Sequence, residues 1–582
     1  MPVDTKAGFA TMRSEDFKQG GAGMKQHYVM PVGEDDFKRV REQYYYVDKT
    51  DLVKTLIDGH AAATLITRPR RFGKTLAMSM LYYFFTLKDA EANRALFEGC
   101  KIEKAGKRYM AEQGSRPVVF LSLKDIKQAS MKGMLEMLGA CMQALYDSFS
   151  YLQEGTMFSV QEKKYYQRVW DGEASEIDLQ LSLKNLTAFL ARFHGRPALV
   201  LIDEYDAPLQ YAWDYGYYDE AIVFMRNYLS SVLKSNSHLD FAVLTGVLRI
   251  AKESIFSSLN NLDVASVASG AYLDAMGFTF EEIKKMAADF QAEDKLLEIK
   301  DWYDGYNFSG QEIYNPWSVI NYFRQNCRPA AYWVNTSGNI ILHHMLQHAK
   351  PSQSKALADL LHGGKIKAVL DEGVIYNEIY RNSDALYTML LTTGYLTMVD
   401  YPDPYEDEVR GTMRIPNREI RLLFKREVMK HLSCMNGGSE LLDKLTEGLL
   451  EGNAQEFGEA LEEFLRQMAS FYDTAARESF YHGLVLGLLA TLMPRFEILS
   501  NRESGYGRFD IAIFPARNQP FGALLEFKVA EQEEDMAERA EEALAQIRDN
   551  DYLSEFKNRS IQNVWQYGIA FCGKKCRIAA GR

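Results

Sequence analysis

The sequence has 582 residues, of which 47% are hydrophobic and 25% charged, a balance typical of globular proteins. A chain of this length exceeds what one hydrophobic core usually supports, so two to four domains are expected. The formal net charge of −12 disfavours one broad nucleic-acid-binding surface but leaves room for a local basic channel. The longest apolar run, at 483–493, is too short to cross a bilayer, so no membrane partner is expected.

Two further features concern the compartment. The six cysteines are scattered, and Cys572 and Cys576, which lie close together, have no nearby histidines to complete a zinc site. This usage predicts a reduced, cytoplasmic protein. Residues 1–34 are polar and lack the hydrophobic segment of a signal peptide, so we expect a flexible lead-in there.

An apolar run at 61–66 leads into a basic loop ending in Gly73, Lys74 and Thr75, and helix-favouring residues follow. The order strand, loop, helix is that of a phosphate-binding loop (Walker A), in which backbone N–H groups and a helix N-terminus cradle phosphates. Lys74 would reach the terminal phosphates and the Thr75 hydroxyl would bind Mg²⁺. Arg68 stands where the first glycine of the motif is usual, so the motif needs support from elsewhere.

Apolar runs and helical periods alternate after this loop. Strands are expected at 117–123, 198–202 and 241–244, and helices at 51–58, 131–152 and 179–193, while 158–178 receives no assignment.

Acidic residues close the strand expected at 198–202. Asp203 would hold Mg²⁺ through water and Glu204 would polarise the attacking water, which are the roles of a Walker B motif. The strand at 241–244 ends in a polar residue suited to sensing the terminal phosphate. Arg249, just beyond it, is a candidate charge stabiliser, with a surface salt bridge as an equal alternative.

The region from residue 256 reads as helical with small strand pairs and dense aromatic turns. Thr279 is expected to N-cap a helix, because acidic residues fill the first turn after it. A further helical pattern at 441–468 is interpreted as a connector to the last part of the chain.

Two strands are expected at 508–514 and 521–529, joined by a turn, so the hairpin is centred near position 518. Asp510 would then lie opposite residue 525 or 526, within one register step. Glu526 and Lys528 share one face, because side chains alternate along a strand. Two carboxylates with a lysine are suited to metal-dependent phosphodiester hydrolysis. The alternative is an edge strand with an exposed Glu–Lys pair.

Several motifs combine into a wider pattern. They lie at 46–50, 68–75, 201–206, 244–249, 302–306, 314–317, 500–505, 507–510 and 526–528. Together they resemble bacterial AAA-ATPase-like proteins with a C-terminal nuclease domain of the PD-(D/E)XK type. In this family arginine replaces the first loop glycine, so the resemblance implies that Arg68, Arg70 and Arg71 form a basic rim.

The resemblance also implies site residues and cofactors. The nucleotide site would comprise Arg70, Arg71, Phe72, Gly73, Lys74, Thr75, Asp203, Glu204 and Arg249. ATP and Mg²⁺ would bind there, with Thr75 and Asp203 as metal ligands. The nuclease centre would comprise Asp510, Glu526 and Lys528, with Mg²⁺ or Mn²⁺ on the two carboxylates.

Related nucleases often carry two more elements. One is an acid on the preceding helix, for which Glu478 is preferred over Glu503. The other is a Gln-x-x-x-Tyr element on the following helix. Here Gln546 is present, but Asn550 takes the tyrosine's place and the tyrosine is Tyr552.

We therefore expect an α/β multidomain protein. Its parts would be a lead-in (1–34), a phosphate-loop AAA-ATPase-like domain (35–255), a mainly helical, winged-helix-like lid (256–436), a helical connector (437–470) and an α/β restriction-endonuclease-like domain (471–582). The expected function is ATP hydrolysis coupled to cleavage of nucleic acid, DNA favoured, in DNA processing or defence. A homo-oligomer would be compatible with this.

Two alternatives stay open. The chain could be a nucleotide-controlled switch or scaffold that binds a protein partner, with an inactive nuclease-like domain. The net charge and the near-neutral last block, with 14 Lys+Arg and 16 Asp+Glu from 471 to 582, favour this alternative. The third reading is an ATPase that binds nucleotide but hardly turns it over.

Overall fold

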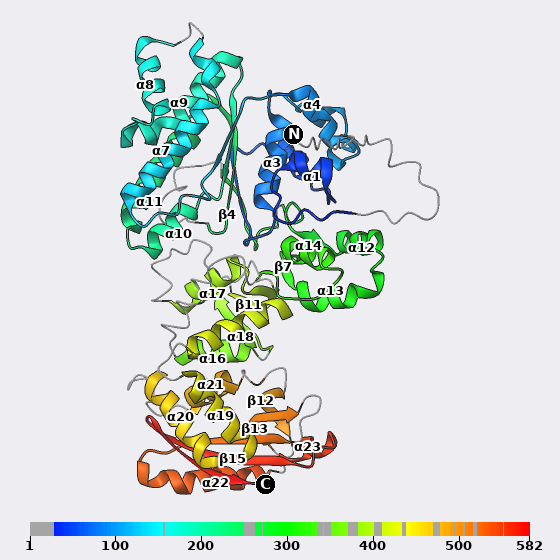
Figure 1. The fold of residues 1–582 in the computed structure, drawn as a ribbon, viewed down its shortest axis with the longest axis vertical. Coiled ribbons are helices and arrows are strands. Elements are labelled where there is room, and N and C mark those ends of the chain that lie inside the picture. The colour runs from blue at the N-terminus through cyan, green and yellow to red at the C-terminus, as the bar shows by residue number, and fades with distance from the viewer. Residues whose placement is uncertain are drawn as a thin grey trace, which may run out of the picture.

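The computed structural model describes most of the chain from residue 28 onward. The described residues are 28–582 except 155–157, 250–261, 271, 334–341, 343–350, 362, 371–381, 401–409, 434–437, 469–477, 490–491, 493–495, 505–506, 516–520 and 551. Three regions follow one another along the long axis of the molecule, with the N-terminal region at one end and the C-terminal sheet at the other (Figure 1).

The N-terminal region is built on a five-stranded parallel sheet in the order β2-β3-β4-β1-β5. The strands are β1 (Ala63–Thr67), β2 (Val118–Ser122), β3 (Ala198–Asp203), β4 (Leu239–Gly246) and β5 (Leu262–Ala265). Parallel strands covered on both faces are apolar throughout, which explains the unbroken apolar runs of β1 and β3. The strands predicted at 117–123, 198–202 and 241–244 are thus confirmed within one or two residues.

Helices cover both faces of this sheet (Figure 1). Alternate residues of β3 enter different cores: Leu199 and Leu201 join one cluster, and Val200 and Ile202 join the other. The helices are α1 (Phe37–Gln43), α2 (Asp51–Gly59), α3 (Lys74–Phe85), α4 (Ala90–Arg94), α5 (Lys101–Lys104), α6 (Lys107–Met110), α7 (Met131–Asp147), α8 (Val160–Trp170), α9 (Glu176–His194), α10 (Ala207–Asp214) and α11 (Tyr218–Leu233).

The first described residues do not form a lead-in. Met30 is buried, the Tyr28 ring packs edge-on against Tyr45, and the Tyr45 amide donates to the Val29 carbonyl. Residues 28–34 are therefore part of the packed structure, contrary to the lead-in expected to residue 34; residues 1–27 lie outside the described part of the chain.

The middle region combines helices with two small antiparallel sheets. The first sheet has the order β6-β8-β7 and the second β10-β11-β9. The elements are β6 (Phe278–Thr279), α12 (Phe280–Asp289), α13 (Leu296–Tyr303), β7 (Tyr306–Phe308), β8 (Gln311–Tyr314), α14 (Pro316–Arg324), α16 (Pro351–Leu361), β9 (Ile366–Val369), α17 (Ser383–Thr392), β10 (Thr397–Asp400), β11 (Arg410–Arg414) and α18 (Arg418–Ser433). Thr279 caps α12 through a capping box with Glu282, as predicted.

The C-terminal region is a five-stranded sheet in sequential order, β12-β13-β14-β15-β16, with the β14–β15 pair parallel. Its elements are α19 (Gly438–Glu451), α20 (Ala454–Met468), α21 (Glu478–Leu489), β12 (Phe496–Ser504), β13 (Gly507–Pro515), β14 (Gly522–Val529), α22 (Met536–Asp549), α23 (Ser554–Asn558), β15 (Val564–Cys572) and β16 (Lys575–Gly581).

The helical connector expected at 437–470 is instead part of this C-terminal core. The pattern read as one helix at 441–468 forms two helices, because Gly452 adopts a left-handed φ of 82° after α19 and Asn453 accepts from the Glu456 amide at the start of α20. Buried residues of both helices pack with β13, β14 and β15 in one hydrophobic cluster. Within the described residues, no helix is both long and apolar enough to cross a membrane.

Candidate functional site

The loop at 68–73 joins the buried strand β1 to helix α3, the arrangement expected of a phosphate-binding loop. Gly73 takes the N-cap position of α3 with a left-handed φ of 84°. Lys74 begins the helix and is 4% exposed, and its Nζ donates to the carbonyls of Arg68 and Pro69, each at 3.1 Å. Burial lowers the pKa of Lys74, while Glu204 and then Asp206 act to raise it.

Asp203 lies at the end of β3 and is fully buried. The Thr75 hydroxyl donates to its Oδ2 at 2.8 Å, and the Thr245 hydroxyl, at the end of β4, donates to its Oδ1 at 2.6 Å. Burial raises the pKa of Asp203, and these two hydrogen bonds oppose the rise. The sheet order therefore brings Asp203 and Thr75 together, as the sequence predicted.

Glu204 follows Asp203 with a left-handed φ of 52°, a conformation that is uncommon outside glycine. Its backbone amide faces the Thr245 hydroxyl at 3.4 Å. Because non-glycine residues in this region cost free energy, such positions are concentrated at sites where a side chain must be aimed.

Arg68 does not contribute to a basic rim. It is fully buried, and its guanidinium donates to the carbonyls of Ala265 and Ser266 at 2.9 and 3.0 Å and of Tyr272 at 2.7 Å. These carbonyls belong to β5 and the chain after it, so Arg68 fastens the loop to the edge of the sheet. Burial lowers the pKa of Arg68 to about 10, so the side chain still carries its charge at neutral pH.

The next three loop residues contact helices and the middle region. Arg70 donates to Gln210 of α10 at 2.5 Å, and Arg71 lies over the Trp317 ring, 4.3 Å from its centroid. Phe72 is fully buried against the rings of Tyr306 and Phe308, so its side chain is a core residue. The basic rim inferred from the sequence is therefore wrong for Arg68 and reduced to Arg70 and Arg71.

A cavity of about 500 Å³ opens in front of this loop. Its lining includes charged and polar side chains, among them Lys74, Thr75 and Glu204, and apolar side chains from 30–47, α3 and 276–278. A lining of both kinds suits a nucleotide, and the volume lies in the usual range for small-molecule sites.

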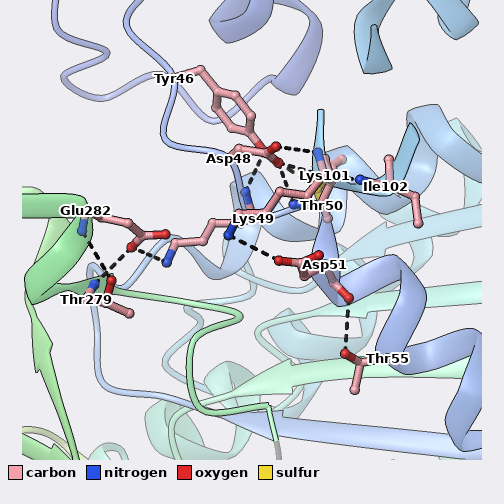
Figure 2. Close-up of polar contacts among 11 residues, drawn as sticks. Tyr46, Asp48, Lys49, Thr50, Asp51, Thr55, Lys101, Ile102, Thr279 and Glu282 are labelled. Carbon is pink, nitrogen blue, oxygen red and sulfur yellow. Dashed lines mark hydrogen bonds and ion pairs between the residues drawn. The ribbon is translucent and has the colours of Figure 1, made fainter. Parts of the chain in front are cut away.

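Residues of the motif at 46–50 line this cavity, and Figure 2 shows the polar contacts that the motif makes. Asp48 accepts from the amides of Thr50 and Lys101, at the starts of α2 and α5. The Lys49 ammonium pairs with Glu282 of α12 at 2.6 Å, with side chains only 13% and 17% exposed. Burial lowers the pKa of Lys49, and the Glu282 carboxylate opposes this. The motif thereby joins the N-terminal region to the middle region.

In the C-terminal region, β13 and β14 pair antiparallel with Ile511 opposite Leu525. This register is the one predicted for a hairpin centred at position 518, and it sets Asp510 beside Glu526. The Phe527 amide donates to Asp510 Oδ2 at 2.7 Å, and the Asp510 amide donates to Glu526 Oε2 at 3.3 Å. The two carboxylates therefore share one corner of the sheet.

The surroundings of this pair follow the expected pattern with one change. Gln546 of α22 donates to Glu526 Oε1 at 2.5 Å and approaches the Tyr552 hydroxyl at 3.4 Å. Asn550 also donates to this hydroxyl, at 3.0 Å. Tyr552 thus contacts Gln546 and Asn550 from beyond the end of α22. Lys528, half-buried, follows Glu526 by two residues on the same face.

Residues 31–256 match the model of a family described as predicted AAA-ATPase, and residues 476–580 match one described as the PD-(D/E)XK nuclease superfamily. The chain combines an AAA-ATPase-like domain with a C-terminal PD-(D/E)XK domain.

One relative matches almost the whole chain. The chain is 26% identical over 562 residues to a protein of Azotobacter chroococcum mcd 1 described as an uncharacterized protein in the vnfD 5′ region. The match covers 93% of this chain and 96% of the relative, so it includes the middle region as well as both domains.

Asp206 and Arg249 follow β3 and β4, and of the two only Asp206 lines the cavity in front of the 68–73 loop. Asp206 is 5% exposed and accepts from the amides of Val247 and Leu248, each at 2.9 Å, so it fixes the turn after β4. Arg249 follows this turn and is half-buried. Asp206 was not singled out from the sequence, although its place at the end of the Asp-Glu-Tyr-Asp run was the available signal.

Two residues are candidates for the accessory acid of the PD-(D/E)XK domain. Glu478 is the first residue of α21 and Glu503 lies in β12, but both side chains fall outside the described ones. His482, one turn after Glu478, is buried and its Nε2 lies 3.1 Å from the Asp510 carbonyl oxygen. Among the described residues, no group of three His, Cys, Asp or Glu side chains is gathered as a metal site.

Proposed function

We propose that this protein is a Mg²⁺-dependent ATPase whose nucleotide state controls a metal-dependent nuclease, acting on nucleic acid and most readily on DNA. The observation that carries the proposal is the pair Asp510 and Glu526 on neighbouring strands, in a chain that also sets Thr75 against Asp203. Both pairs consist of oxygen ligands, which Mg²⁺ prefers.

In the ATPase step, Mg²⁺ would be held by Thr75 and Asp203 and would offset the negative charge of the phosphates. Lys74, at the start of α3, would bind the terminal phosphates, and the helix N-terminus would stabilise them further. Glu204 would accept a proton from the attacking water. Thr245 holds Asp203 in place and would report the phosphate state to β4.

In the nuclease step, Asp510 and Glu526 would hold Mg²⁺ or Mn²⁺, which lowers the pKa of a bound water. Gln546 keeps the Glu526 carboxylate oriented. Lys528 would stabilise the charge that develops on the phosphate. Glu478 is the proposed accessory acid, with Glu503 as the alternative.

The middle region would act as a winged-helix-like lid between the two steps. Trp333 donates its indole N–H to the Arg70 carbonyl at 3.2 Å, and its backbone amide donates to Glu419 of α18 at 2.7 Å. Helix α18 in turn packs against α19 of the C-terminal region. A change at the 68–73 loop thus has a continuous set of contacts toward the nuclease centre.

The test is cleavage of linear, circular and single-stranded DNA and of RNA, with Mg²⁺ or Mn²⁺, in the presence and absence of ATP. Asp510→Asn and Lys528→Ala are each expected to lower the rate by about 100-fold or more. Asp549→Asn, an exposed acid in the same domain, is the matched control and is expected to retain the rate. Equal inactivity of wild type and variants on every substrate would refute the nuclease.

ATP turnover is tested separately with Glu204→Gln. Loss of a general base lowers turnover by about 100- to 10,000-fold, while ATP binding stays because the Gln side chain keeps the shape of the site. Phosphate release and equilibrium binding of ATP are the two measurements. Unchanged ATP turnover in Glu204→Gln would show that Glu204 is not the general base. Absence of turnover in wild type would show that the protein binds ATP without hydrolysing it.

One observation favours the switch or scaffold as the second candidate. Glu526 is only 3% exposed and both of its oxygens already accept hydrogen bonds, from Gln546 and from the Asp510 amide. A buried carboxylate with both oxygens hydrogen-bonded in this way can have a purely structural role. This candidate predicts ATP-dependent capture of a protein partner that Asp510→Asn leaves intact, with no cleavage by wild type.

A further inference from the structure

A second cavity, of about 530 Å³, lies in the middle region between α13, the end of β11 and the first turns of α18. None of its lining residues lines the cavity in front of the 68–73 loop. Neither the ATPase step nor the nuclease step uses it. Its volume is that of sites that bind small molecules.

The lining of this cavity is strongly basic. It contains five cationic side chains, Lys300, Arg414, Arg418, Arg421 and Lys425, and two carboxylates, Asp301 and Asp304. Lys300 lies 3.5 Å from Asp304, and Arg418 lies 3.2 Å from Asp301, so each acid has a cationic neighbour, although Asp304 Oδ1 lacks a hydrogen-bond partner in the described structure. Arg414, Arg421 and Lys425 make no ion pair with any residue in the described parts of the chain.

Lys425 is the most informative of these cations. It is half-buried, and burial alone lowers its pKa to about 8. Placing an ammonium group in such a position is unfavourable unless an anion offsets the lost hydration. The cavity therefore has a site for negative charge that the described residues do not fill.

Helix α18 adds a second attraction for anions at the same place. Asn417 caps it by accepting from the Ile420 amide at 3.0 Å, and the N-terminus of a 16-residue helix carries partial positive charge. Asn417 is 6% exposed, yet its side-chain Nδ2 lacks a hydrogen-bond acceptor in the described structure. A buried amide donor without an acceptor is uncommon, and because Asn417 lines the cavity, an oxygen atom bound there could accept from it.

We propose that this cavity binds a small phosphorylated ligand of about nucleotide size, independently of ATP at the 68–73 loop. Phosphate oxygens match the guanidinium groups of Arg414 and Arg421, which can bind them in pairs of hydrogen bonds. The side chains of Leu361 and Leu422 supply an apolar wall for the rest of the ligand. The bound ligand lies against the helix whose Glu419 holds Trp333, and Trp333 contacts the 68–73 loop.

The experiment measures the stoichiometry of pyrophosphate binding by the full chain in equilibrium dialysis. Wild type is expected to bind two pyrophosphates, one at each site. Lys74→Ala, which weakens the loop, and Arg421→Ala, which weakens the cavity, are each expected to retain one. In Lys74→Ala/Arg421→Ala the remaining affinity is expected to fall about tenfold or more, since a charge-assisted hydrogen-bonded pair is lost.

Arg426→Ala is the matched control, because Arg426 is an exposed arginine on the same helix that does not line the cavity. Added to Lys74→Ala, it is expected to leave the remaining site intact. Absence of binding by Lys74→Ala, or an equal loss in the Arg426→Ala double variant, would overturn the proposal. Lys425→Gln provides a second variant if Arg421→Ala does not fold, with the same expected loss.

Competition identifies the source of the phosphate. In the Lys74→Ala protein, a nucleoside 5′-monophosphate is expected to displace pyrophosphate at least as well as a 5′-phosphorylated eight-nucleotide single strand at equal concentration. Displacement by the single strand alone would overturn a small-ligand site and assign the cavity to a nucleic-acid path instead.

Discussion

Arg68 occupies a position that is usually glycine in phosphate-binding loops, and its guanidinium group is bonded to backbone carbonyls rather than exposed to a ligand. A glycine at this position lets the loop turn freely, whereas arginine fixes one conformation by hydrogen bonds to the neighbouring edge strand. Arginine in place of glycine thus reduces the freedom of the backbone and adds tertiary contacts. From the sequence alone, the same arginine is interpreted either as a defective motif or as part of a basic rim.

Replacement of Arg68 is therefore expected to be severe. Arg68→Ala would leave several buried carbonyls without donors and a cavity in the core, at a cost of about 3 kcal/mol or more in unfolding free energy. Arg71→Ala is the control, because a half-exposed cation over Trp317 contributes about 0.5–1 kcal/mol. Denaturant unfolding of the two variants would reveal this difference, and equal losses would contradict it.

The buried carboxyl group of Glu419 is expected to make the stability of the protein depend on pH. Burial raises its pKa from 4.5 to about 7, although the Trp333 amide and Ser318 hydroxyl donate to it. A carboxyl with a raised folded-state pKa contributes stability that is full below the unfolded pKa and is lost as pH rises through about 7.

The stability of wild type is accordingly expected to fall between pH 5 and pH 8, by on the order of 2 kcal/mol from this residue. Glu419→Gln removes the titration, so its unfolding midpoint should change less across that interval. Thermal unfolding at each pH measures the difference. The same slope in wild type and variant would show that Glu419 is already ionised throughout.

Packing of whole elements explains how the candidate nuclease centre is assembled. Gly568 of β15 lies under α22, and a Cβ there would stand 2.1 Å from the Ala540 carbonyl oxygen and 2.4 Å from the Leu544 amide nitrogen. Both contacts are with backbone, so the helix itself would have to move. Helix α22 carries Gln546, which orients Glu526.

Gly568→Ala is expected to displace α22, to cost about 1–3 kcal/mol of stability as overpacking does, and to lower nuclease activity by loosening Glu526. Gly458→Ala in α20 is the matched control. There the added Cβ meets Ile578 at 3.6 Å, an ordinary contact, and alanine favours the helix. Nuclease assays and thermal unfolding of both variants test this, and equal behaviour would contradict the close approach of α22.

Some of these helices and strands are predicted by the sequence and others are not. Strands of the parallel sheet are predicted because burial on both faces makes them continuously apolar, and the β13–β14 register follows from hairpin symmetry. Helix α8 was not assigned, since its polar composition hides a capping box at Ser159 and Glu162. Strand β12 likewise received no prediction, because its identity depends on pairing with a distant partner.

The residues of the candidate sites also differ in how far the sequence predicts them. Thr75, Asp203, Asp510 and Glu526 were named from local patterns: Thr75 follows the glycine and lysine of a phosphate-binding loop, Asp203 ends an apolar strand, and Asp510 and Glu526 face each other across a hairpin. Thr245 and Tyr552 were noted from the sequence too, but their hydrogen bonds to Asp203 and Gln546, and the contacts of Asp206, depend on which strands and turns become neighbours. That information is in the tertiary structure and not in local spacing.

At the scale of the whole molecule, hydrophobic clusters run from the AAA-ATPase-like domain into the middle region, and the Lys49–Glu282 pair, which crosses the same boundary, is the most buried ion pair among those described (Figure 2). A buried pair that loses one partner leaves an uncompensated charge, while loss of both partners is much milder.

A double-mutant cycle with Lys49→Met and Glu282→Gln tests this link. Each single variant is expected to cost about 3 kcal/mol, and the double variant less than the sum, with a coupling of about 1–3 kcal/mol. ATP-dependent nuclease activity should fall in the single variants if the contact transmits the nucleotide state. Additive effects would show that the two side chains do not interact across the domain boundary.

The hydrogen bonds of Arg68 also determine when the 68–73 loop can take its final conformation during synthesis of the chain. Its partner Tyr272 lies 204 residues further along the chain, which takes roughly 10–40 s to translate at about 5–20 residues per second. During that interval the nascent 68–73 loop lacks the carbonyls that hold it. The growing chain is therefore expected to acquire nucleotide affinity only after β5 and Tyr272 have emerged, so that ATP does not bind before this part of the chain is made.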